Sequence, residues 1–407
     1  MFCLLLPVLA LLAPKAMVLL LLVGFVIAAA LRWREGGGLA QPDRLSCLCL
    51  ALLICWCLVA SAWSFEPLDA VLRALRTGLV MLIGLLFVCL AWETPRDDAR
   101  RALRWLCLGT LVALAIVAEE LIFGHPLFIA VKGNAANAYL EASRLNRGAS
   151  ALSMLSWLAA AGLILQGRKG IAVAGLLATG AVLFCLESSA AMLAFAAAVV
   201  ILLLGFLSPG AARLLLLFSV AVPLFGSPVV AKVMNHAGMS ETRGLQTTAR
   251  ERVYMWNFTA ERISEKPLLG WGFNASRDMP NQGIAPFDPS RGKHKKNKRA
   301  AAPPHSHVIA HHPHNAGLQI LLELGLVGAV LAAALLWAFL RGLDRLPAAS
   351  LPWARASVLA TLAVAGTAYG IWQNQWLATI AANTAMVALL GAAARPPTDP
   401  PSTTADP

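Results

Sequence analysis

The sequence predicts an all-α polytopic membrane protein with about twelve transmembrane helices. Of its 407 residues, 58% are hydrophobic and only 13% are charged, whereas soluble domains carry roughly 25% charged residues. The mean hydropathy is +0.69. Apolar runs lie at 2–13, 16–31, 45–63, 71–92, 102–123, 148–166, 170–187, 190–207, 211–230, 316–340, 354–372 and 376–394. The first run is short, so residues 1–31 could instead form one broken crossing.

The distribution of basic residues predicts the orientation of these helices. Alternate connectors hold Arg32, Arg34, Arg44, Arg96, Arg100, Arg101, Arg104, Arg168, Lys169, Arg213, Arg341, Arg345 and Arg355. By the positive-inside rule, these connectors face the cytoplasm. We therefore expect membrane helices in 1–230 and 316–394, a large external loop at 231–315, and a disordered cytoplasmic tail at 395–407.

The predicted external loop is unusually basic. Residues 231–315 hold thirteen Lys and Arg against six Asp and Glu. Long loops cross the membrane regardless of charge, so this excess favours an anionic ligand outside, although a solvated loop under no constraint is the alternative. The whole chain carries a formal charge of +12. Its basic residues are dispersed between apolar runs, which argues against nucleic acid and favours membrane lipids and phosphate groups as partners.

Residues 248–266 within this loop predict an amphipathic helix. One apolar face follows the spacing of three and four residues and comprises Val253, Trp256, Ala260 and Ile263. Such a helix can lie flat on the membrane with Arg250 and Arg252 at head-group depth, where guanidinium groups bind phosphate bidentately. The alternative is an ordinary surface helix with ion pairs between neighbouring turns.

Histidines cluster just before the run at 316–340. Five of the eight lie close together, at His305, His307, His311, His312 and His314. Zinc is one interpretation, but their spacing is irregular and no cysteine or carboxylate accompanies them. In the other, Pro313 occupies the first turn of the next helix and Asn315 or His312 caps it. His314 would then stay neutral near the helix N-terminus and could act as a general base, or it could simply be a capping or interfacial histidine.

Other ionisable residues gather at the outer ends of the predicted helices rather than at the membrane midplane. Charge near a membrane is costly and usually functional. This distribution favours a reaction site at the outer surface over a transport path, although each residue could be an interfacial anchor. The residues are Glu66, Asp69, Arg73, Arg76, Glu119, Glu120, Arg144, Arg147 and Glu187.

Two motifs flank the basic loop in a fixed order. The first is Arg252-Val-Tyr-Met-Trp256 followed by Pro-Leu-Leu-Gly-Trp-Gly-Phe at 267–273. The second is His312-Pro-His-Asn315 followed by Leu-Gln-Ile-Leu-Leu-Glu-Leu-Gly-Leu-Val-Gly at 318–328. Together they resemble the R-x-x-x-W…P-L-x-G-x-G-F and H-x-H-N-x-x-L-Q-x-L-x-E-x-G-x-x-G patterns of the O-antigen ligase and polymerase superfamily. The ordered pair is more specific than either motif alone.

The resemblance implies a glycosyltransferase of the bacterial inner membrane, with a GT-C-like fold and an active site facing the periplasm. It would transfer O-antigen glycan from undecaprenyl pyrophosphate to a sugar hydroxyl of lipid A–core, without a metal or cofactor. The motifs map the catalytic residues onto His314 and Arg252. Arg147 lies in Asn-Arg-Gly at 146–148, which resembles a further family segment. Arg147, Arg250 and Arg144 are then the expected pyrophosphate ligands, and His312, Asn315 and Trp256 are expected to contact the acceptor or support the site.

The expected chemistry is direct displacement with inversion, in which His314 takes the proton of the acceptor hydroxyl. A covalent route would need a positioned carboxylate, for which Glu66, Asp69, Glu119, Glu120 and Glu187 are candidates. Three other functions stay open: an O-antigen polymerase, transfer to a protein hydroxyl, and a flippase or transporter of lipid-linked glycan. A transporter predicts midplane charges and internal repeats, and the sequence shows neither. The basic loop favours the ligase, because lipid A–core is phosphorylated.

Overall fold

A computed structural model of the protein describes residues 1–38, 41–124, 126, 138–186, 188–242, 247–280, 308–309 and 311–396, with the backbone alone at 138–144 and 247. Throughout these ranges the regular structure is helical, and they contain no strand. The prediction of an all-α membrane protein is therefore confirmed. The predicted tail lies outside the described residues from 397 onward, as do residues 281–307 of the predicted external loop.

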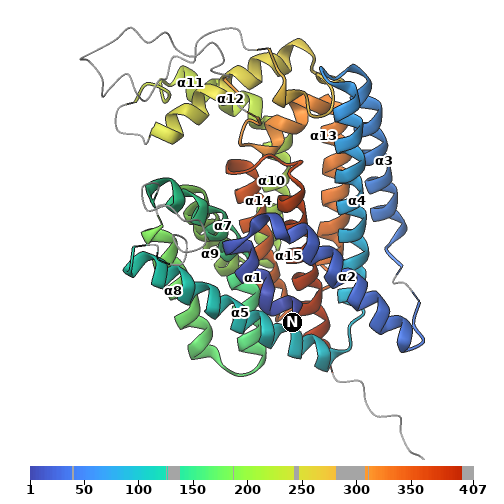
Figure 1. The fold of residues 1–407 in the computed structure, drawn as a ribbon, viewed down its shortest axis with the longest axis vertical. Coiled ribbons are helices and arrows are strands. Elements are labelled where there is room, and N and C mark those ends of the chain that lie inside the picture. The colour runs from blue at the N-terminus through green and yellow to red at the C-terminus, as the bar shows by residue number, and fades with distance from the viewer. Residues whose placement is uncertain are drawn as a thin grey trace, which may run out of the picture.

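The helices follow the predicted apolar runs closely (Figure 1). They are α1 Phe2–Leu12, α2 Met17–Arg34, α3 Arg44–Ala60, α4 Pro67–Trp92, α5 Arg96–Ile122, α7 Ala138–Leu165, α8 Lys169–Cys185, α9 Ser189–Leu207, α10 Pro209–Ala221, α11 Ser227–His236, α12 Thr247–Glu265, α13 Ala316–Leu343, α14 Leu351–Thr367 and α15 Asn374–Ala393. A π-helical turn at Val222–Gly226 joins α10 to α11, so this helical segment continues beyond the predicted end at residue 230.

Fewer helices than the sequence predicts are long and apolar enough to cross a membrane. Nine helical segments within the described residues are long and apolar enough to cross a membrane. The three other predicted runs form shorter helices: α1 has 11 residues, and α8 and α14 have 17 each. A helix of 11 residues spans only about 16 Å, about half of a hydrocarbon core. The count of twelve is thus not confirmed, and the first run is the least able to cross alone.

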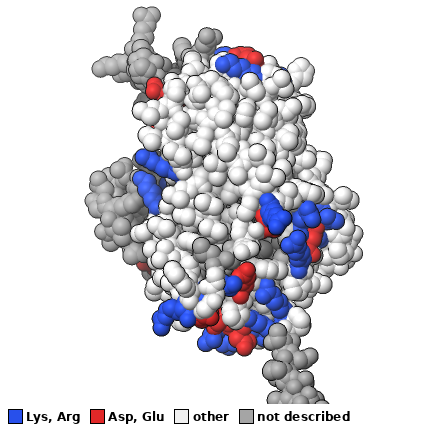
Figure 2. Space-filling view, turned by 90° about the vertical axis from the view of Figure 1, so that its right-hand side faces the viewer, with Lys and Arg blue, Asp and Glu red and all other residues white. Residues whose placement is uncertain are grey.

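The helices form one bundle with two distinct ends. α15 packs against α4, α14 against α9 and α7, and α13 against α3. Figure 1 shows α11 and α12 across the top of the bundle, at the end where α13 begins. In Figure 2, charged side chains gather mainly toward the lower end of the visible face, beneath a broad uncharged surface. This separation of apolar and charged surface is what a membrane protein requires.

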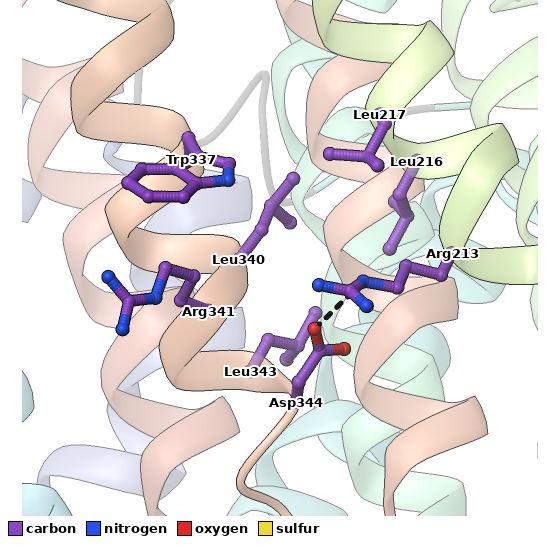
Figure 3. Close-up of a pocket in the computed structure, with 8 residues that line it drawn as sticks. All are labelled: Arg213, Leu216, Leu217, Trp337, Leu340, Arg341, Leu343 and Asp344. Carbon is purple, nitrogen blue, oxygen red and sulfur yellow. Dashed lines mark ion pairs between the residues drawn. The ribbon is translucent and has the colours of Figure 1, made fainter. Parts of the chain in front are cut away.

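An ion-pair cluster holds three helices together at the end opposite α12. Arg213 on α10 contacts Asp344, which directly follows α13, with 3.1 Å between the guanidinium nitrogen and the carboxylate oxygen (Figure 3). Arg355 on α14 contacts the other oxygen of Asp344 at 3.1 Å and also donates to the carbonyl of Pro209. The shared carboxylate therefore fixes α10, α13 and α14 at the end that the positive-inside rule predicts to be cytoplasmic.

Candidate active site

The amphipathic helix that the sequence predicts at 248–266 is confirmed as α12, Thr247–Glu265. Its predicted apolar face is buried at Val253, Ala260 and Ile263, and Trp256 is half-buried. This face packs against α13 and α11. α12 therefore lies firmly on the bundle, which fixes the positions of Arg252 and Trp256.

The segment after α12 is inserted into a break in α13. The backbone of α13 leaves helical geometry at Gly325 (φ 65°, ψ −165°). Trp271 N–H donates to the carbonyl of Leu322 (2.8 Å), and Leu326 N–H donates to that of Pro267 (2.9 Å). A Cβ atom at Gly325 would lie 2.2 Å from the carbonyl oxygen of Leu268, so only glycine permits this approach. The two sequence motifs are thus physically joined by backbone hydrogen bonds.

Glu323 connects this junction to a third segment. Its side chain is fully buried. One carboxylate oxygen accepts from Ser276 Oγ (2.5 Å) and Gln319 Nε2 (2.9 Å), and the other accepts from Asn274 N–H (2.8 Å) and Trp372 Nε1 (2.7 Å). Four donors satisfy both oxygens, as a buried carboxylate requires. Glu323 therefore fixes the loop between α14 and α15 against α13.

The histidine turn precedes α13 directly. Asn315 is the N-cap, and its Oδ1 accepts from Leu318 N–H at 3.0 Å. The expectation that Pro313 lies in the first helical turn is wrong, because the helix begins at Ala316. Nor does His312 cap the helix, since its Nδ1 accepts instead from His314 N–H (3.2 Å). His314 adopts a left-handed backbone with φ 53°, an uncommon conformation outside glycine that is often found at functional sites.

The imidazole of His314 is held in one tautomer. Its Nδ1 lies 2.5 Å from the carbonyl oxygen of Ala368, at the end of α14. A carbonyl oxygen can only accept, so Nδ1 carries the hydrogen and Nε2 keeps its lone pair in the neutral ring. The His314 ring also contacts that of His312, with centroids 4.2 Å apart. His312 Nε2 lies 3.0 Å from the side-chain amide of Gln373.

Both rings favour the neutral form. Burial is the main reason why the pKa of His314 lies below its ordinary value; the hydrogen bond to Ala368 opposes this shift, and the charge of Arg252 adds to it. Burial also lowers the pKa of His312 to about 3, with further contributions from His314, His311 and Arg277. At neutral pH, His314 therefore has a free lone pair for accepting a proton.

Two of the predicted phosphate ligands, Arg252 and Arg147, lie near residues of the histidine turn or their partners. Arg252 is half-buried and close enough to His314 to influence its titration. Arg147 is exposed and lines a small cavity of about 20 Å³ together with Tyr369 and Gln373. Because Gln373 contacts His312, this cavity adjoins the histidines. Arg147 and Arg252, which are distant in sequence, are thus both related to the histidine turn, Arg147 through Gln373 and Arg252 through its effect on His314.

Trp256 also contacts the histidine turn, and the remaining predicted residues have other partners or fall outside the described side chains. Trp256 Nε1 donates to the carbonyl of Pro313, between the two histidines. Arg250 Nε donates to the Ser240 carbonyl (3.0 Å). Arg144 lies on α7, where the structure describes its backbone alone. Among the carboxylates, Asp69 pairs with Arg73 and Glu120 is fully buried. Glu187, His305 and His307 lie outside the described residues.

The part of the chain that the structure describes contains no group of three or more His, Cys, Asp and Glu side chains able to hold a metal ion. Two of the five clustered histidines fall outside that part, so this result concerns His311, His312 and His314. The described members of the cluster instead make hydrogen bonds to protein groups.

Several residues of the site escaped the sequence interpretation. Ala368 contributes only its carbonyl, which leaves no mark on the sequence. Gln319 and Glu323 do lie in the second motif, and polar residues within an apolar run were the available signal. Gln373 lies in Trp-Gln-Asn-Gln-Trp, a polar interruption between the last two apolar runs. Arg277 had no distinguishing pattern.

An apolar groove with a volume of about 460 Å³ reaches the site from the side of the bundle. Trp256 and Asn315 line it beside the histidine turn. The rest of its wall comes from α9, α10, the π-helical turn, α11 and α14, through residues that include Leu193, Val200, Phe218, Val222, Leu359 and Leu362. Such a wall suits a hydrocarbon chain.

Comparison with known proteins identifies similarity over the same part of the chain. Residues 173–333 match the protein-family model described as O-antigen ligase. This range runs from α8 to the middle of α13 and includes α12, the histidine turn and Glu323. The matched range therefore contains both motifs and the segment between them.

Similarity over a longer part of the chain extends to proteins of Rickettsia whose names begin "Putative polysaccharide ligase". The protein of Rickettsia bellii is 26% identical over 332 residues, which cover 80% of this chain and 75% of the relative. That of Rickettsia felis is 25% identical and covers 81% and 76% of the two chains. The Rickettsia prowazekii protein is 26% identical over 331 residues, covering 80% and 76%.

Proposed function

We propose that this chain is a member of the O-antigen ligase family, as its similarity to that family's model and to the polysaccharide ligases of Rickettsia supports, and that it transfers O-antigen glycan from undecaprenyl pyrophosphate to a sugar hydroxyl of lipid A–core. The observation that supports this most is the hydrogen bond from His314 Nδ1 to the Ala368 carbonyl. It leaves Nε2 as a proton acceptor beside Arg252, and a glycosyl transfer to a hydroxyl needs a base next to positive charge.

The donor's two chemical parts match two features of the site. Arg252 and Arg147 would bind the pyrophosphate, because planar guanidinium groups form bidentate contacts with phosphate oxygens. The polyprenyl chain would lie in the apolar groove that begins at Trp256 and Asn315. Arg250 on α12 and Arg144 on α7, the helices that carry Arg252 and Arg147, would add positive charge around the pyrophosphate.

The proposed reaction is a single displacement. The acceptor oxygen attacks the anomeric carbon while His314 Nε2 removes its proton, and the bond from that carbon to the pyrophosphate oxygen breaks. The electron pair of this bond goes to undecaprenyl pyrophosphate, whose negative charge the arginines stabilise. The anomeric configuration inverts. Arginine charge does the work of leaving-group stabilisation, so the proposal uses no cofactor.

We further propose that the protein lies in the inner membrane with His314 facing the periplasm. The support is the arginine distribution among the connectors and the position of α12 at the opposite end of the bundle from the Asp344 cluster. On this view, residues 1–230 and 316–394 hold the membrane helices, and 231–315 form the periplasmic loop. A reporter fused after Gly283 should be accessible only from the periplasm, and one after Asp399 only from the cytoplasm. The reverse pattern would contradict the proposed location.

The activity is tested by purified enzyme with lipid-linked glycan and lipid A–core. Wild-type protein should form glycan-capped lipid A–core, and His314→Ala should lower the rate by about 10²–10⁴-fold while still binding donor. His236→Ala is the matched control, because His236 is exposed at the end of α11. EDTA should not change the rate. An active His314→Ala enzyme would contradict the proposed mechanism.

The acceptor is tested separately in a deletion strain. Loss of a ligase leaves core without polymer, while polymer accumulates on undecaprenyl pyrophosphate. Cores that carry single repeats would instead identify a polymerase with the same donor. Unchanged lipopolysaccharide in that strain would contradict both acceptors.

A further inference from the structure

A second cavity lies at the arginine-rich end of the bundle, between α5, α7 and α8. Its volume is about 640 Å³, and we call it the basic cavity. Arg100 and Arg104 lie one turn apart on α5, and Arg168 lies in the connector that precedes α8. Cys107, Leu108, Leu111, Leu163, Leu165, Gln166 and Ile171 complete its wall.

The basic cavity carries uncompensated positive charge. No carboxylate is among its lining residues. Arg100 donates from Nε to the Ala393 carbonyl (3.1 Å), which orients it but does not neutralise it. Among the described residues, the guanidinium groups of Arg104 and Arg168 have neither an ion pair nor a hydrogen bond. The nearby Arg101, by contrast, pairs with Asp98 outside the cavity. Three cations facing one space favour a ligand with an anionic group.

The wall beneath these arginines is apolar and extends toward the membrane interior. Leu108 and Leu111 follow Arg104 along α5 and are each 44% exposed, and Ile171 is 47% exposed. From Arg104 to Leu111 the helix rises about 10 Å, so the lining descends from the membrane interface into the hydrocarbon region. The ligand must therefore combine an anionic head with an apolar chain.

We propose that the basic cavity binds an anionic glycerophospholipid from the leaflet that the positive-inside rule makes cytoplasmic. Its phosphate would contact Arg104 and Arg168, with Arg100 behind them, and an acyl chain would lie along Leu108 and Leu111. Basic pockets between membrane helices on the cytoplasmic side bind anionic lipid head groups of this kind. A zwitterionic lipid lacks the net charge to match three arginines, and free phosphate leaves the apolar wall uncovered.

This site is independent of the proposed transferase function. Along α7, Leu163 is sixteen residues beyond Arg147, a rise of about 24 Å. The residues that line the basic cavity take part in none of the contacts around His314. A phospholipid there would contact the protein in the leaflet opposite the proposed reaction.

Lipid binding to the purified full-length protein tests the proposal by native mass spectrometry. Phosphatidylglycerol added after delipidation should bind with one high-affinity molecule per chain, and phosphatidylcholine should bind much more weakly. Arg104→Gln with Arg168→Gln should weaken phosphatidylglycerol binding about 30-fold, since each basic group near the surface contributes about fivefold. The matched control is Arg34→Gln with Arg101→Gln, because both residues are exposed and neither lines the cavity.

A third variant separates the lipid from a free anion. Leu111→Trp fills the apolar wall without changing the charge, and it should also weaken phosphatidylglycerol binding. Equal binding of the two lipids, or equal weakening in the control pair, would overturn the proposal. If inorganic phosphate displaced the lipid at a similar concentration while Leu111→Trp bound the lipid as well as wild type, that pair of results would overturn the proposal in favour of a phosphate site. Unchanged thermal stability of each variant confirms that these comparisons concern folded protein.

Discussion

The indole nitrogen of Trp256 donates a hydrogen bond to the carbonyl oxygen of Pro313, at a distance of 2.8 Å. The two residues are 57 positions apart and belong to the two sequence motifs. Pro313 lies between His312 and His314, so this bond ties the histidine turn to α12. Since α12 also carries Arg252, the same contact relates the proposed base to the proposed phosphate ligand.

Trp256→Phe should therefore reduce transfer without unfolding the protein. The phenyl ring keeps most of the packing, but the Pro313 carbonyl loses its donor, a loss of about 1 kcal/mol. We expect kcat/KM to fall about fivefold, measured with purified enzyme and lipid-linked glycan. Trp105→Phe is the control, because Trp105 is exposed on α5 at the other end of the bundle. A Trp256→Phe enzyme as active as this control would show that the bond does not position the turn.

Sequence periodicity was sufficient to predict the helices but not the contacts between them. α12 lies within one residue of its predicted bounds, because its apolar face repeats with the helical period. Asn315 is one of the two caps that the sequence predicts, and the structure confirms it, since capping is local chemistry. The span count does not follow from hydropathy alone, because hydropathy does not distinguish a short helix such as α1, with 11 residues, from a full crossing.

The partners of the site depend on tertiary contacts that no local pattern encodes. Ala368 acts through its carbonyl, which any residue would supply. Glu323 follows an apolar stretch, and its role arises only when Ser276 and Trp372 approach from two other segments. The sequence shows Gly325 as a glycine within a predicted helix. The structure explains why glycine is needed there, because the backbone of Leu268 lies against it. The motif therefore indicated that these positions matter, and the structure supplies the physical cause.

Arg252→Ala should lower transfer at least 100-fold, because a half-buried guanidinium that stabilises the leaving group contributes several kcal/mol. Arg252→Lys should restore little activity, since a point charge cannot reproduce bidentate phosphate contact. Arg147→Ala should have a milder effect, because Arg147 is exposed. Transfer rates at matched protein levels provide the measurement.

The control for Arg252 is Arg262→Ala on the same helix. Arg262 pairs with Glu265 and does not line the groove, so its loss should leave transfer near the wild-type rate. Equal activity of Arg252→Ala and Arg262→Ala would remove Arg252 from the site.

Glu323→Ala should destabilise the protein strongly. Four donors, from Asn274, Ser276, Gln319 and Trp372, would lose their acceptor in a buried site, and each unsatisfied donor costs about 1–3 kcal/mol. We expect a loss of about 3–5 kcal/mol in unfolding free energy after relaxation. Glu323→Gln keeps one acceptor oxygen and should lose about half as much.

Thermal unfolding in detergent, followed by intrinsic fluorescence, measures the loss of stability in Glu323→Ala and Glu323→Gln. Glu261→Gln is the control, because Glu261 is exposed on α12 and its change should be close to zero. If Glu323→Ala melted at the wild-type temperature, the buried cluster would not hold the loops in place.

The pH dependence of transfer should report the environment of His314. Burial, together with the charge of Arg252, lowers the pKa of this imidazole, against the opposing hydrogen bond to Ala368. A general base must be neutral, so kcat/KM should fall as the pH drops through that lowered pKa. The acid limb of the profile should therefore lie below the ordinary imidazole pKa of about 6.5, and activity should be level above it.

Substitutions at Arg252 should shift the acid limb of this profile in a defined direction. A purely structural role of Arg252 would not produce such a shift. Arg252→Gln removes the positive charge, so the pKa of His314 should rise and the acid limb of the residual activity should move to higher pH. Arg252→Lys keeps the charge, and its limb should stay near the wild-type position although its rate is low. In His314→Ala the limb should vanish from whatever activity remains. An acid limb that persists in His314→Ala would assign the titration to another group, and one that does not move in Arg252→Gln would separate Arg252 from the proposed base.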